Sequence, residues 1–141
     1  MGTRSTTTIY DGEKPIVTIY RQYDGYPDGH GAALANFISG KEMVNGFGGG
    51  DTSRQFNGAG DLAMRLITAL KDGNADDIGN FYIVPYENAG DDDYHYDVIV
   101  GPVGSEPYVK VKCFGTPIAE GPVSQIVQLA TEAESAGDDE D

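Results

Sequence analysis

The order in which β-rich and helical segments follow one another constrains the fold of this chain most. Two runs rich in β-branched and aromatic residues, 6–10 and 16–20, are separated by a short polar loop, which predicts a β-hairpin. Two helical patterns follow, then three further β-rich runs and a last helical pattern. These later segments are the helices 31–39 and 61–71, the strands 81–86, 94–100 and 108–114, and the helix 124–134.

Short connections between the strands and the lack of repeated β-α-β units favour antiparallel pairing. We therefore expect an α+β fold in a single domain spanning residues 1–136. Five strands should form one mainly antiparallel sheet, and about three helices should pack mainly on one face of it. The acidic residues 137–141 are expected to form a disordered tail.

Several classes of protein are disfavoured by composition. The longest apolar runs are far shorter than the ~18 residues of a membrane-spanning helix, and residues 1–5 lead into threonines rather than into a secretory signal. Cys113 is the only cysteine, so no disulfide can form within the chain. These features predict a soluble protein in the reducing cytoplasm of a host cell.

The net charge of −14 comes entirely from the second half of the chain. Residues 1–71 hold seven basic and seven acidic side chains, whereas residues 72–141 hold two basic and sixteen acidic ones. Direct binding of nucleic acid through the second half is therefore disfavoured, because phosphate contacts need a basic surface. Regional acidity of this kind serves solubility, attracts a basic partner or imitates a nucleic-acid backbone.

The densest mixture of chemical groups lies between the second strand and the first helix. Turn-forming residues follow one another there, so the chain should reverse sharply and present backbone N–H groups at a helix start, where anions are favoured. Forked donors and flat aromatic rings suit a planar or phosphorylated ligand. The candidate ligand-binding residues in this stretch are Arg21, Tyr23, Asp24, Tyr26 and His30. The alternative is an ordinary tight connection.

A glycine-rich stretch, residues 41–60, precedes the second helix. Residues 46–51 lack both the Gly-Lys-Ser/Thr ending of a Walker loop and the dinucleotide GxGxxG spacing. Arg54 and Asn57 complete the candidate ligand site, because the starts of the two helices are expected to converge on one anion-binding pocket. The alternative role for Asn57 is a helix cap.

No metal, cofactor or catalytic centre is predicted. The histidines, His30 and His95, lack a partner four residues away, and the acidic residues 91–93 lack the alternation of a calcium loop. No GxSxG motif is present, although a triad set by space alone stays open. Asp28 and His30 are close enough for an acid–base pair, which is kept as a minor alternative.

Three segments carry a resemblance to a known group of proteins: MGTRS at residues 1–5, IYRQYDGYPDGHG at residues 19–31 and FNG at residues 56–58. They resemble small uncharacterised proteins encoded by phages and prophage-bearing bacteria, over roughly the first half of the chain. The resemblance implies a viral or mobile-element origin and carries no activity or catalytic residue.

The sequence thus predicts a non-enzymatic phage or mobile-element accessory protein that binds a small, planar, nucleotide-like anion. The alternative is an acidic protein that binds or inhibits a basic host protein, by imitating nucleic acid or by simple charge attraction. The oligomeric state stays open.

Overall fold

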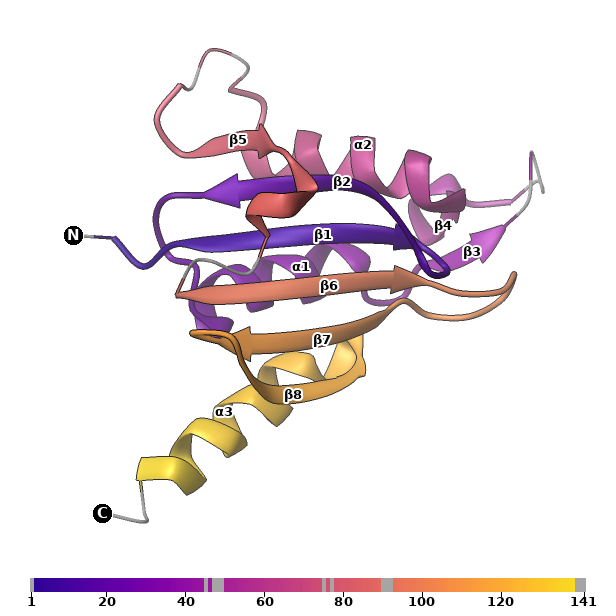
Figure 1. Cartoon of the computed structure of the whole chain (residues 1–141). Coiled ribbons are helices and arrows are strands. Elements are labelled where there is room, and N and C mark those ends of the chain that lie inside the picture. The colour runs from indigo at the N-terminus through magenta and orange to yellow at the C-terminus, as the bar shows by residue number, and fades with distance from the viewer. Residues whose placement is uncertain are drawn as a thin grey trace.

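The computed structural model describes residues 2–44, 46, 50–74, 76, 78–89 and 93–138, with side chains as far as residue 134. It confirms an α+β fold, in which helices lie behind a large sheet (Figure 1). The strands are β1 Ser5–Asp11, β2 Lys14–Arg21, β3 Glu42–Val44, β4 Gln55–Asn57, β5 Phe81–Val84, β6 Tyr94–Val100, β7 Tyr108–Cys113 and β8 Thr116–Pro122. The helices are α1 Ala32–Ile38, α2 Gly58–Lys71 and α3 Ile126–Asp138, with single turns η1 Pro27–Gly31, η2 Thr52–Arg54, η3 Tyr86–Asn88 and η4 Val123–Gln125.

Within these residues the main sheet has six strands in the order β5-β2-β1-β6-β7-β8, not five. The strand missed by the sequence is β8, because its two prolines and its glycine hide any alternation; an edge strand tolerates them. The sheet is mixed, because β1 and β6 pair in parallel whereas every other pair of neighbouring strands in this sheet is antiparallel.

The stretch 41–60 also holds a second, two-stranded parallel sheet of β3 and β4, where only a loop was expected. Helix α3 continues to Asp138, four residues past its predicted end at residue 134. Residues 139–141 of the predicted tail lie outside the described residues.

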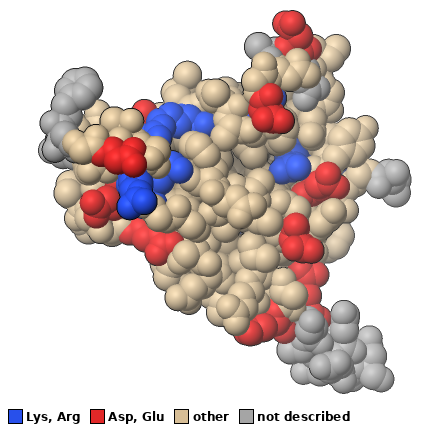
Figure 2. Space-filling view, turned by 180° about the vertical axis from the view of Figure 1, so that it is seen from behind, with Lys and Arg blue, Asp and Glu red and all other residues tan. Residues whose placement is uncertain are grey.

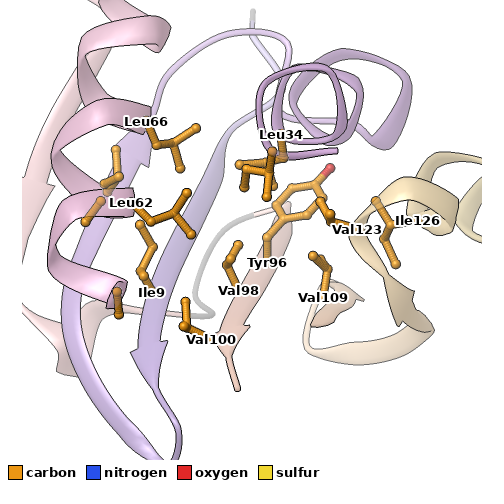
Figure 3. Packing of buried hydrophobic residues seen from close by; sticks show 14 of the residues in the cluster. Ile9, Leu34, Leu62, Leu66, Tyr96, Val98, Val100, Val109, Val123 and Ile126 are labelled. Carbon is orange, nitrogen blue, oxygen red and sulfur yellow. The ribbon is translucent and has the colours of Figure 1, made fainter. Parts of the chain in front are cut away.

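The hydrophobic core lies between the sheet and the helices, on the face that Figure 3 shows from close by. Side chains at alternate positions of the central strands point into it, as the pleat of a β-strand requires. Helices α1 and α2 close it from the other side. Its fully buried members include Ile9, Leu34, Leu62, Leu66, Tyr96, Val98, Val109 and Ile126.

Within the described part of the chain, the opposite face of the sheet carries no long helix. The turn η3 lies in front of β2 and β1 in Figure 1, and the hydroxyl groups of Tyr10 and Tyr86 are 3.1 Å apart there. Beneath it, Thr8 and Thr18 are buried and share a 2.8 Å hydrogen bond between their hydroxyl groups. Paired threonines therefore replace apolar packing on this face.

No described helix is long and apolar enough to cross a membrane.

Candidate functional site

The predicted site around Arg21 lies at one end of the sheet, where β2 ends. Arg21 is directly opposite Ser5 at the start of β1 and Phe81 at the start of β5. The chain then turns through Asp24, whose φ of 61° is left-handed, and enters η1. Aspartate tolerates a left-handed φ better than most residues, so Asp24 suits this turn, as its sequence predicts.

His30 is fully buried beneath this turn and forms part of the core rather than of the surface. Its Nε2 lies 2.6 Å from Thr7 Oγ1, and its Nδ1 lies 3.1 Å from an Arg21 nitrogen. Its ring packs edge-to-face with that of Tyr96, with ring centres 5.0 Å apart. Because a guanidinium only donates hydrogen bonds, Nδ1 must accept, and Nε2–H donates to Thr7. The geometry fixes one neutral tautomer.

Burial, assisted by the neighbouring Arg21 charge, lowers the pKa of His30 to about 3. The imidazole is therefore uncharged at neutral pH. It cannot attract an anion by charge, and it positions Thr7 and Arg21 instead. Asp28 is exposed, whereas both ring nitrogens of His30 are hydrogen-bonded to Thr7 and Arg21. Asp28 and His30 therefore do not form the acid–base pair that was kept as a minor alternative.

Arg21 is half-buried and held on three sides. Its Nε donates to the backbone oxygen of Tyr23 at 2.6 Å, a terminal nitrogen donates to His30, and its guanidinium lies 5.1 Å from the centre of the Phe81 ring. Burial lowers the pKa of the Arg21 guanidinium, and the charge of Asp24 partly opposes this effect. Among the described residues, Arg21 makes no ion pair within 4.0 Å.

Ser5 faces Arg21 across the ladder, and its side chain is fully buried. Its hydroxyl oxygen has no hydrogen-bond partner among the described residues. Gly25 packs directly against it, because a Cβ built on Gly25 would lie 2.8 Å from Ser5 Cβ. A buried hydroxyl without a partner is uncommon and costs free energy.

Two tyrosines border this group on the solvent side. The side chains of Tyr23 and Tyr26 are 52% and 40% exposed. The Tyr26 hydroxyl donates to Asp24 at 3.3 Å, and the carboxylate of Asp24 is the main cause that raises the pKa of Tyr26. Beneath them, the buried hydroxyl of Tyr96 donates to the backbone oxygen of Gly25 at 2.7 Å and holds the turn in place.

Arg54 and Asn57 lie at the other end of the sheet, so the expected shared pocket is wrong. Arg54 lines a shallow hollow with Gly104, which lies in the connection after β6. Arg21 instead lies opposite Ser5, which pairs with the first residue of β6. The length of β6 separates the two groups by about 20 Å. Figure 1 shows the reason: α1 leaves the Arg21 end and α2 starts at the opposite end.

At that second end, the Asn57 side chain accepts from the backbone N–H of Gly46 at 2.8 Å and makes no side-chain cap of α2. Asp61 accepts the backbone N–H of Asn57 at 2.8 Å instead. Arg54 is 81% exposed and lies 3.8 Å from Asp51. Figure 2 shows the basic side chains of this end interleaved with acidic ones.

Sequence reasoning missed a polar network on the open face of the sheet. His95 Nδ1 lies 2.8 Å from Thr6 Oγ1, and His95 Nε2 lies 2.7 Å from a carboxylate oxygen of Asp97. The available signal was the spacing of His95 and Asp97, which places them on one face of a strand. The order hydroxyl, imidazole, carboxylate matches a triad. However, Thr6 is 1% exposed, which keeps it from a substrate.

Other reactive groups are sparse in the part of the chain that the structure describes. No group of three or more possible metal ligands occurs there. Cys113 is half-buried at the end of β7, and burial raises the pKa of its thiol. An open groove of ≈ 530 Å³ on β7 and β8 has lysines and carboxylates side by side, so it has no strong preference for either sign of charge; these side chains are Lys110, Lys112, Asp97 and Glu120.

Comparison with protein-family models, with curated proteins and with solved structures finds no match to this chain.

Proposed function

We propose that this chain is a non-enzymatic accessory protein of phage or mobile-element origin that binds a small, planar, nucleotide-like anion at the Arg21 end of the sheet. One observation carries the proposal. Arg21 is half-buried and makes no ion pair within 4.0 Å among the described residues. Buried charges are normally paired, so an anionic group from a ligand suits this position.

The surroundings suit a flat ligand that carries donors as well as negative charge. The exposed rings of Tyr23 and Tyr26 offer faces for stacking, and the Asp24 carboxylate accepts hydrogen bonds from amino or hydroxyl groups. Asp24 also repels further negative charge, which favours nucleoside monophosphates over triphosphates. Phe81 and the neutral His30 hold the guanidinium in place before a ligand arrives.

A thermal-shift and calorimetric screen with nucleotides, cyclic nucleotides and inorganic phosphate tests this proposal. Ligand at about a hundred times its Kd should stabilise the protein by about 2.7 kcal/mol. Tyr23→Ala and Arg21→Gln should weaken binding, whereas Arg54→Gln at the opposite end should not. The absence of any shift with all of these ligands at millimolar concentration, or an equal loss of binding with Arg54→Gln, would remove the proposal.

A second candidate function is attraction of a basic partner, and α3 favours it. The end of α3 extends away from the sheet in Figure 1, and Figure 2 shows acidic side chains beside it. Glu132 and Glu134 stand near the C-terminal end of a helix that has no basic residue in its last turn. The backbone dipole makes that end negative, so these acids oppose local stability. Charges that lower the stability of a helix end are expected where function needs them.

Capture of basic proteins from bacterial lysate at low and high salt tests the second candidate. Glu132→Gln together with Glu134→Gln should reduce the captured amount. The matched control removes the same number of charges elsewhere, at Glu13 and Glu87. If the two doubly substituted proteins behave alike, only the overall charge matters and a docking role for α3 is excluded.

A further inference from the structure

The two edges of the six-stranded sheet are protected very differently. The β8 edge carries two prolines, a glutamate and a register irregularity opposite β7, and α3 packs along it. These features discourage another strand from pairing. The β5 edge, Phe81–Val84, contains neither proline nor charge, in a chain with 23 acidic residues. It forms the other edge of the sheet.

Exposed apolar side chains gather around this edge. The side chains of Ile83 and Tyr82 are 67% and 46% exposed. Beside them, Ile16 and Tyr86 are also exposed and line a small hollow with Ile83 and Val84. An exposed strand edge with this composition is a template for a further strand.

The backbone hydrogen bonds determine which groups face outward. Gln22 N–H donates to the backbone oxygen of Asn80 at 2.9 Å, and these two residues continue the β2–β5 register by one pair. Hydrogen-bonded pairs alternate in an antiparallel ladder, so Tyr82 and Val84 also direct their backbone groups toward β2. The backbone N–H and C=O groups of Phe81 and Ile83 therefore point away from the sheet.

We propose that β5 pairs antiparallel with β5 of a second copy of this chain, about a two-fold axis at Tyr82. In this register Phe81 of each copy faces Ile83 of the other, and the outward groups of both residues exchange four hydrogen bonds. Tyr82 meets Tyr82 of the second copy on the open face. There it already stacks on Tyr20, with ring centres 5.7 Å apart, so four tyrosine rings form one row.

The two-fold register suits a second copy, because Phe81 and Ile83 of each copy supply the donors and acceptors that the outward backbone groups of the other copy need. Charge adds a specific signature. Each copy has a net charge of −14, which repels the other copy at long range, whereas the strand itself is uncharged. Screening weakens the repulsion and leaves the strand pairing intact, so association should strengthen as salt rises from low to physiological concentration.

Sedimentation velocity and light scattering over a dilution series test the proposal with the full chain. Wild type should dimerise, more tightly at physiological than at low ionic strength. Ile83→Lys should be monomeric, because a charged residue on an edge strand opposes pairing. Val103→Lys is the matched control: it makes the same charge change at an aliphatic side chain that is 62% exposed outside this edge, and it should dimerise like wild type.

Cysteine cross-linking in a Cys113→Ser background tests the register. Tyr82→Cys should form a disulfide-linked dimer, because facing residues of such a pair have Cα atoms about 4.5 Å apart, within disulfide range. Ile83→Cys should not, because the two copies of residue 83 would be about 8 Å apart. The proposal is overturned by a monomer under all conditions, a dimer that survives Ile83→Lys, cross-linking that favours residue 83, or a different protein pairing with β5.

Discussion

Thr7 Oγ1 and His30 Nε2 lie 2.6 Å apart in the core, joining the central strand β1 to the turn η1. Because Arg21 donates to the other ring nitrogen of His30, the Thr7 hydroxyl is the acceptor for Nε2–H. The position of Arg21 in the candidate site therefore depends on a threonine of the central strand. The following predictions test this arrangement and its surroundings.

Replacement of Thr7 by valine should destabilise the fold by about 1–3 kcal/mol, because it leaves the buried Nε2–H of His30 without an acceptor. Thr7→Ser is the matched control, since it keeps the hydroxyl and removes only a methyl group. Urea unfolding of the two variants measures the difference. Equal stability of the valine and serine variants would contradict the assigned hydrogen bond.

Stability should depend on pH through His30. The folded pKa of His30 is about 3, below its ordinary value of 6.5, so the unfolded chain binds a proton that the folded protein rejects. The contribution of His30 is complete above pH 6.5 and is lost as the pH falls toward 3, by about 1.4 kcal/mol per pH unit. His30→Gln should show a correspondingly flatter dependence in urea unfolding. If the ring NMR signal of His30 titrated near pH 6.5 in the folded protein, the prediction would be contradicted.

Two glycines should respond in opposite directions to alanine. A Cβ on Gly25 would lie 2.7 Å from the carbonyl carbon of Arg4 and 2.9 Å from its oxygen. Backbone atoms cannot move aside easily, so Gly25→Ala should destabilise the fold. Gly60 is an exposed residue of α2 with no atom within 4 Å of an added Cβ, and Gly60→Ala should stabilise by about 0.5–1 kcal/mol. Thermal unfolding measures both, and equal signs would refute the pair.

Arg65 should anchor the segment before α2. Its two terminal nitrogens donate to the backbone oxygens of Gln55 and Thr52, at 2.5 Å and 3.0 Å. Lysine cannot reproduce this forked arrangement, so Arg65→Lys should speed hydrogen exchange at residues 52–55. Arg54→Lys is the control, because Arg54 is exposed. Similar exchange in the two variants would show that the fork does not hold the segment.

Local patterns in the sequence account for the elements that were predicted well. The helix α2 shows apolar residues at helical spacing, and β7 alternates buried valines with lysines that are exposed or half-buried, so both follow from periodicity alone. The candidate residues from Arg21 to His30 are close together in space because the chain is continuous there. The inward position of His30 has no local signal, since it depends on Thr7 from another strand.

Long-range geometry accounts for the errors. Nothing near residues 94–100 indicates that β6 pairs in parallel with β1 rather than with β5, which precedes it. The separation of Arg54 from Arg21 depends on the direction of α1, which carries the chain from one end of the sheet to the other. The sequence indicates at which residue a helix begins, but it does not indicate near which end of the sheet that residue lies.

The position of β1 also matters while the chain is being synthesised. Strand β1 can pair with β2 once residue 21 has left the ribosome. Its other edge has no partner until β6 is synthesised, and the hydrogen-bond partner of Thr6, His95, lies 89 positions later in the chain. Non-local contacts of this kind slow folding and leave a strand edge open to other chains. Residues 5–8 are a serine and three threonines, so both faces of this strand carry hydroxyl groups that water can solvate during that interval, which disfavours aggregation through apolar contacts.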